Sequence, residues 1–200
     1  MVSKTKFHKL HAAFIGAGAL ILLAGAPLAF ARGHSGGSSL VAFQAVGSGT
    51  ATSTNPCLPD TDAVCTATFS GSLRGEHIGN STVSADISVQ HLTANAIPNG
   101  QTGEFCFPAS GTGTITAADG STMNLAEVGL LCDVPPATGS SLEPQTFSGS
   151  YYIEGGTKRF ANAVGSGQTT ASDDGNTTPT VIFSLSGALG GFGGGDDHHS

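Results

Sequence analysis

The chain has 200 residues, of which 38% are hydrophobic, 10% are charged and 30 are glycine. So little charge excludes a disordered polyelectrolyte, and 11 Phe with many Val, Ile and Leu are enough to build a core. A net charge of −7 makes nucleic acid and anionic lipid poor partners. The length predicts one domain, and abundant Gly, Ser and Thr favour a β protein with many tight turns.

The first 31 residues have the pattern of a cleaved secretory signal peptide. Three lysines precede an apolar run over 12–31, which ends in the sequence Ala-Phe-Ala that a signal peptidase reads. We predict cleavage between Ala31 and Arg32 and export by a Sec-type route, to the periplasm or the cell exterior. The alternative is an uncleaved anchor, because about 20 apolar residues can just span a bilayer. Cleavage leaves no stable membrane span, and residues 32–38 are expected to form a flexible N-terminal segment.

All four cysteines follow the signal, and an even number suits disulfides in an oxidising compartment. Cys57 and Cys65 bracket a short loop that can close locally. Cys106 and Cys132 flank a predicted hairpin with its turn at 119–120; a two-residue turn there leaves them one position out of register, which one bulge corrects. We predict the bridges Cys57–Cys65 and Cys106–Cys132 rather than a metal site, because no CxxC or Cys/His spacing is present.

Apolar residues beyond the signal fall on alternate positions, as strands with one buried face require. Clusters of Gly, Pro, Asn and Asp separate these segments, and no sustained 3.6-residue period predicts a long helix. Eight antiparallel strands in ~150 residues must bury one face, which predicts an all-β fold, either an eight-stranded antiparallel β-barrel or a β-sandwich. The expected strands are 39–48, 65–74, 82–91, 103–116, 122–132, 145–154, 163–171 and 180–189.

The segment GGTKRFANAVGSG at 155–167 has a clear structural purpose. Gly155 and Gly156 permit positive φ where the chain leaves a strand, Phe160 is expected to plug the end of the core, and Gly165 opens the next strand. The segment resembles the GGTGRFAGATGSG sequence of the allene oxide cyclase and dirigent barrel families. Lys158 takes the place of one of the usual glycines.

The resemblance covers about residues 40–190 and extends to 69–79, which is similar to a small-residue strand and turn of a secreted bacterial branch of these families. It implies a calycin-like, eight-stranded barrel with a lumen, commonly assembled as a trimer. Characterised members cyclise an unstable fatty-acid epoxide or direct the coupling of phenoxy radicals. Their lumen residues have no matching positions outside the glycine segment, so the resemblance implies the fold and not the activity.

Glu127 is the candidate catalytic residue, because it interrupts an apolar stripe that runs from Met123 to Leu131. If this stripe faces the interior, the carboxyl is desolvated and its pKa is raised. More often the opposite stripe, which includes Val128 and Leu130, faces the core. From the sequence alone we favour that second arrangement, in which Glu127 is solvated.

The candidate ligand-binding residues are scattered along the chain: Glu76, His77, His91, Tyr152 and Arg159. Glu76 and His77 fall in a predicted turn, where function is common, and His91 ends an apolar strand near a barrel rim. Arg159 belongs to the basic pair with Lys158, which could hold an anionic ligand or a neighbouring subunit's carboxylate. For each of them a solvated turn or strand end is the simpler interpretation.

The barrel domain is expected over 39–190, followed by a Gly-rich tail over 191–200 that ends in Asp-Asp-His-His. A flexible tail of this kind would have to order itself to bind a metal, so we expect a solvated tail and no metal site. No cofactor is expected either, because the chain has no phosphate loop and no nucleotide-binding glycine motif before a helix.

Three functions fit these features. The first is an exported barrel that binds a small apolar ligand, and the second is a structural or interaction module whose interior is filled by Ala, Gly, Val and Phe. The third is an isomerase or dirigent-type enzyme, which needs a buried ionisable group such as Glu127. We rank binding or structural roles ahead of catalysis, and the resemblance adds the expectation of a homo-oligomer.

Overall fold

A computed structural model describes residues 39–53, 64–90, 96–98, 105–136, 143–176 and 178–193. The predicted signal peptide, the segment 32–38, Cys57, His91 and the end of the tail lie outside these residues. The elements are β1 (Val41–Ser53), β2 (Cys65–Gly75), β3 (Gly79–Val89), β4 (Ile97–Pro98), β5 (Phe105–Ala117), β6 (Thr122–Asp133), β7 (Gln145–Gly156), a 3-10 helix η2 (Lys158–Phe160), β8 (Val164–Asp173) and β9 (Thr180–Gly190).

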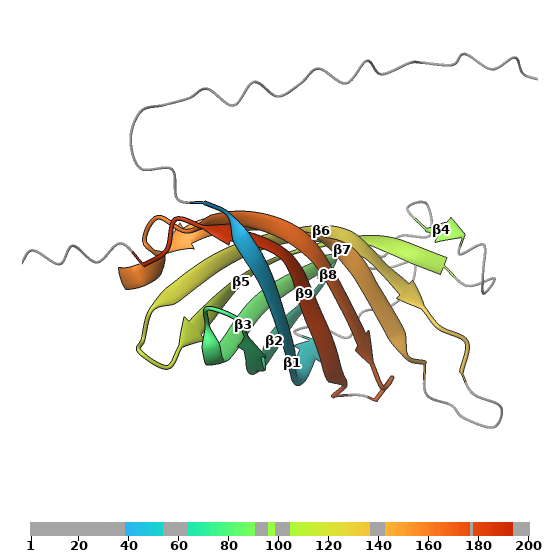
Figure 1. Ribbon diagram of the computed structural model, residues 1–200. Coiled ribbons are helices and arrows are strands. Elements are labelled where there is room, and N and C mark those ends of the chain that lie inside the picture. Colours follow the sequence, from blue (N-terminus) through green and yellow to red (C-terminus); the bar gives the residue numbers. More distant parts are fainter. Residues whose placement is uncertain are drawn as a thin grey trace, which may run out of the picture. The chain divides into compact units, whose positions relative to one another are not determined.

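The strands form a closed antiparallel barrel (Figure 1). Neighbours along the sheet follow the order β3-β2-β1-β9-β8-β7-β6-β5-β4, and β3 also pairs with β5, which closes the ring. This pairing confirms the eight-stranded barrel and excludes the sandwich alternative. All eight predicted strands are present, with ends shifted by a few residues.

Strand β4 is additional, in a stretch that we predicted as a turn. Its two residues pair with Cys106 and Phe105, at the end of β5 that extends beyond β3 (Figure 1). Pro98 is tolerated there because β4 lies outside the ring, as expected for a proline in a strand. The strand therefore covers a part of β5 that the barrel leaves unpaired.

Alternation decides which side chains enter the barrel. In every strand of the ring the odd-numbered residues supply the interior, and the even-numbered ones are mostly Ser and Thr on the outer face. Since successive side chains of a strand point to opposite faces, the period of two in the sequence is enough to fix the inward set.

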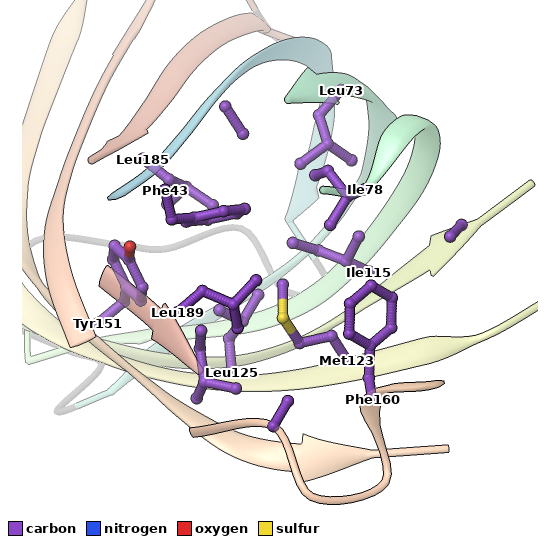
Figure 2. Close-up of a cluster of buried hydrophobic side chains, with 14 residues drawn as sticks. Phe43, Leu73, Ile78, Ile115, Met123, Leu125, Tyr151, Phe160, Leu185 and Leu189 are labelled. Atoms are coloured by element: carbon purple, nitrogen blue, oxygen red, sulfur yellow. The ribbon is translucent and has the colours of Figure 1, made fainter. Parts of the chain in front are cut away.

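One end of the barrel is packed with apolar side chains that converge from around the ring (Figure 2). Phe160 of η2 and Phe43 of β1 are fully buried, and Ile78 closes this end from the β2–β3 turn with 2% of its surface exposed. The expected plugging role of Phe160 is confirmed. Connections at this closed end are short: 76–78, 118–121 and 157–163.

The turn at the closed end of β5 and β6 corrects the predicted register. Ala117 pairs its backbone N–H with the carbonyl of Ser121, so the loop has three residues, 118–120, with Gly120 at φ +73°. A three-residue loop with a left-handed Gly shifts the register by one and places Cys106 directly opposite Cys132. The predicted Cys106–Cys132 disulfide is present, but the two-residue turn and the bulge were wrong.

The glycine segment behaves as expected at Gly155, which has φ +93°. Gly156 remains in β7, and a Cβ there would overlap the Thr122 carbonyl group. Lys158 adopts φ +51°, a left-handed conformation that glycine adopts more easily. Its Nζ donates a hydrogen bond to the Asp119 carbonyl at 3.0 Å, so the bulky residue ties this turn to the β5–β6 hairpin.

Candidate functional site

The other end of the barrel contains a cavity of about 800 Å³. Small-molecule sites usually fall between about 300 and 1,000 Å³. The wall is mainly apolar and comes from all eight strands of the ring; it includes Ala51, Ala67, Phe69, Val83, Ile87, Phe107, Ala109, Leu131, Phe147, Ala171 and Phe183. The interior is therefore filled at one end and hollow at the other, which the sequence pattern did not distinguish.

Pairs of glycines, with Phe rings lying against them, leave room for this cavity. Gly129 pairs directly with Gly149, and the Phe147 ring lies where their side chains would be, 2.8 Å from the position a Cβ would take on either glycine. Phe69 lies in the same way against the paired Gly49 and Gly71. Because glycine has no side chain, the rings rest against the wall rather than standing across the lumen.

Glu127 points into the cavity. It belongs to the same inward stripe as Met123 and Leu125, it lines the cavity, and its Oε1 lies 3.2 Å from where a Cβ on Gly111 would be. Our preference for a solvated Glu127 was wrong, because register places the stripe from Met123 to Leu131 inside. Burial raises the pKa of this carboxyl, and the nearby Thr169 hydroxyl opposes part of the rise.

Two hydroxyl groups accompany Glu127 in the middle of the barrel. Tyr151 is directly opposite Glu127 in the β6–β7 ladder, and Thr169 is on β8, the next strand. Tyr151 is 1% exposed and Thr169 is 5% exposed. The Thr169 hydroxyl interacts with the Glu127 carboxyl, whereas the Tyr151 hydroxyl has no hydrogen-bond partner among the described residues. Burial raises the pKa of Tyr151 to about 12, so this phenol is neutral at physiological pH.

Unpartnered buried hydroxyls are uncommon, because an unsatisfied polar group costs about 1–3 kcal/mol. Here Tyr151 and Thr169 line the cavity together with Glu127. The Tyr151 hydroxyl lies against Gly167 and Gly187 of β8 and β9, whereas the Glu127 carboxyl lies beside Gly111 of β5 and interacts with Thr169. Glu127 and Thr169 therefore form the polar floor of an apolar cup, and the Tyr151 hydroxyl lies apart from them.

The mouth of the cavity is acidic and structurally fixed. Gln145 donates from its Nε2 to Asp133 Oδ1 at 3.0 Å and from its backbone N–H to Asp173 Oδ1 at 2.9 Å. Asp173 also accepts from the backbone of Gly175 at 2.9 Å. Glu143 lines the same mouth, so three carboxylates surround the entrance.

The predicted binding residues do not gather at this cavity. Glu76 and His77 occupy the β2–β3 turn at the closed end, where His77 has φ +64° and its ring lies 5.0 Å from that of Phe192. Tyr152 is 53% exposed on the outer face of β7. None of these three lines the cavity, and His91 lies outside the described residues.

The basic pair at the closed end already has a partner in the same chain. Arg159 Nε lies 3.0 Å from Asp119 Oδ2, and its guanidinium covers the Phe160 ring at 4.5 Å. The Ser121 backbone and hydroxyl, helped by Arg159 and Lys158, lower the pKa of Asp119. This pair therefore fastens η2 to the β5–β6 hairpin and is remote from the cavity.

Some of the site could have been found in the sequence. Tyr151 alternates with Phe147 and Ile153 in the predicted strand 145–154, so its inward direction could be expected, and only its pairing with Glu127 depended on the β6–β7 register. Thr169 gave no signal, since a Thr among many Ser and Thr residues is not distinctive. The acidic mouth required knowledge of which strand ends meet.

Comparison with protein-family models, curated proteins and solved structures gives no match for this chain. No helix in the described part is long and apolar enough to cross a membrane. The described residues contain no group of three or more His, Cys, Asp or Glu arranged to hold a metal ion. Cys65 is disulfide-bonded, and its predicted partner Cys57 lies outside the described residues.

Proposed function

We propose that this chain is an exported binding protein whose half-hollow barrel takes a small apolar ligand through its acidic end. The observation that carries the proposal is the cavity of about 800 Å³, lined mainly by aromatic and aliphatic side chains, with Glu127 and Thr169 as polar groups on its floor. Eight-stranded barrels are just wide enough either to be filled by side chains or to hold one small ligand. A purely structural module would gain stability from a filled interior, so the cavity favours binding.

The lengths of the connections between strands also indicate that the open end is the entrance to the cavity. Three of the four connections between the strands at the open end, 54–64, 90–104 and 134–144, are longer than any at the closed end, and the fourth is 174–179. Binding residues are often found on loops held by a rigid scaffold. The Cys106–Cys132 disulfide joins two strands next to these connections, which favours a mouth of fixed shape.

A neutral apolar fluorescent probe, N-phenyl-1-naphthylamine, tests the proposal. We expect saturable binding at micromolar concentration to the mature protein. Ala67→Trp places a large ring in the cavity and should abolish binding, whereas Thr68→Trp places the same ring on the outer face of β2 and should leave it unchanged. Equal binding by both variants, or no saturable binding by the wild type, would reject the proposal.

Native and denatured mass spectra of the protein secreted by its own host complete the test. The denatured mass reports cleavage after Ala31 and the number of disulfides. The native mass reports the oligomeric state, for which the family resemblance suggests a trimer, and any retained ligand. A mass excess that disappears on denaturation would identify the natural ligand class.

An isomerase or dirigent-type enzyme is the second candidate, favoured by Glu127. An interior carboxyl with a raised pKa is suited to general acid–base catalysis near neutral pH. Incubation of an extracted ligand with wild type and with Glu127→Gln distinguishes the two functions. Turnover that the variant loses would indicate an enzyme, and recovery of unchanged ligand from both would indicate a binding protein.

A further inference from the structure

We infer that the ligand is an apolar amine, a molecule with a hydrocarbon or aromatic body and one protonated amino group, and that Glu127 is its counter-ion inside the barrel. This inference rests on the proposed function and names its ligand class. It follows from the signs of the charges around the cavity and from the hydrogen-bonding groups on its floor.

Among the described residues, every charged side chain that lines the cavity is acidic: Glu127, Asp133, Glu143 and Asp173. Glu127 is the deepest of them and has no cationic partner among the lining residues. A carboxylate moved out of water without a partner is unfavourable, and a ligand ammonium group would remove much of that cost. A ligand carboxylate would increase it.

The electrostatic field at the mouth of the cavity also favours a cationic ligand. After residue 38 the sequence has three Lys and Arg residues, and Arg74, Lys158 and Arg159 all belong to the closed end. The sequences that connect strands at the open end contain no Lys or Arg. A mouth lined by one sign of charge raises the local concentration of ions of the opposite sign and repels anions such as fatty acids.

The floor provides acceptors in a number that suits an ammonium group. Such a group has three donors and no acceptor, as in lysine. The Glu127 carboxylate has two acceptor oxygens, and the hydroxyl of Thr169, which interacts with this carboxyl and also lines the cavity, adds a third.

Three ligands of equal chain length test the inference: dodecylamine, dodecanol and dodecanoate, each used to displace N-phenyl-1-naphthylamine at pH 7 and below its micelle concentration. We expect the amine to bind most tightly and dodecanoate most weakly. One charge-assisted hydrogen bond should favour the amine over the alcohol by about 10- to 100-fold. Equal affinity of amine and alcohol would overturn the inference while the binding function stands.

The Glu127→Gln variant separates the contribution of Glu127 to amine affinity from that of the acidic mouth. The variant should reduce amine affinity to that of the alcohol and leave alcohol affinity unchanged, while Glu154→Gln, on the exposed outer face of β7, should change neither. At 0.5 M salt the mouth is screened, and the remaining amine preference should still depend on Glu127. A preference that survives Glu127→Gln would overturn the role of Glu127, whereas failure of the neutral probe to bind would reject the binding function itself.

Discussion

Removal of the Cys106–Cys132 disulfide by a double Cys→Ser substitution should lower the free energy of unfolding by about 3.5 kcal/mol. The two cysteines are 26 residues apart in sequence. In the chain-entropy model, a loop of that length loses about 12 cal/mol/K when it is closed in the unfolded chain, which is about 3.5 kcal/mol at 25 °C. The bridge adds no register constraint of its own, because the ladder already places the two residues opposite each other.

Urea unfolding of the mature protein, followed by circular dichroism, is the direct assay. The same loss should appear as a decrease in Tm of about 10 °C, since 1 kcal/mol corresponds to about 2–4 °C in a domain of this size. Reductant should then destabilise the wild type more than the double variant, in which the predicted Cys57–Cys65 bridge is the remaining target.

An unchanged midpoint and an unchanged urea slope would refute the reasoning. A smaller midpoint shift with a changed slope would have another meaning, because the slope reports the surface exposed on unfolding. In that case the unbridged chain would keep residual structure when unfolded, and the entropic estimate would use the wrong reference state.

Three further predictions concern the interior. Phe160→Ala should destabilise the barrel by about 3–5 kcal/mol in urea unfolding, because the fully buried ring closes the packed end; a loss below 1 kcal/mol would show that Phe160 is not part of the core. Gly149→Ala should cost about 1–3 kcal/mol or more, since its Cβ would overlap the Val128 carbonyl oxygen and meet the Phe147 ring at 2.8 Å, and the exposed control Ser148→Ala should be neutral. Burial raises the folded-state pKa of Glu127, so its contribution to stability is complete below the unfolded pKa and is lost as pH rises through the folded pKa. Glu127→Gln should therefore be more stable than wild type at pH 8, and the difference should shrink at pH 4; a less stable variant at pH 8 would contradict this.

The sequence was sufficient for the strands because burial in a small barrel imposes a strict alternation. Phe69 and Tyr151 fall on inward positions in the sequence and in the structure. Strand β4 was not predictable in the same way, because two residues around a proline have no period. The predicted length of the turn at 118–120 was wrong for a related reason. An Asp-Gly sequence indicates a turn but does not fix its length, and one residue more or fewer changes every pair in the ladder.

The candidate site was less predictable because it depends on relations between strands. The direction of Glu127 was decided by the register that its whole strand adopts, and local sequence supported both faces. His77 and Arg159 drew attention because charged residues and histidines are few in this sequence, yet their positions in the structure are explained by turns at the closed end. Charged and His residues are few in this sequence, but their rarity did not indicate which residues line the cavity.

The two ends of the barrel separate the packed core from the cavity in which we propose that a ligand binds. The closed end contains the fully buried Phe43 and Phe160, short connections and the Arg159–Asp119 ion pair. The open end contains the cavity, the three longest connections and a mouth whose charged lining residues, among those that the structure describes, are all acidic. The filled core of the closed end lies on the other side of the Glu127 floor. We therefore expect substitutions at the open end, such as Ala67→Trp, to change ligand binding while the closed end maintains the fold. The buried carboxyl itself reduces stability, and the proposed cationic ligand would offset that cost, so the bound ligand should stabilise this barrel most at a pH where Glu127 would otherwise ionise alone.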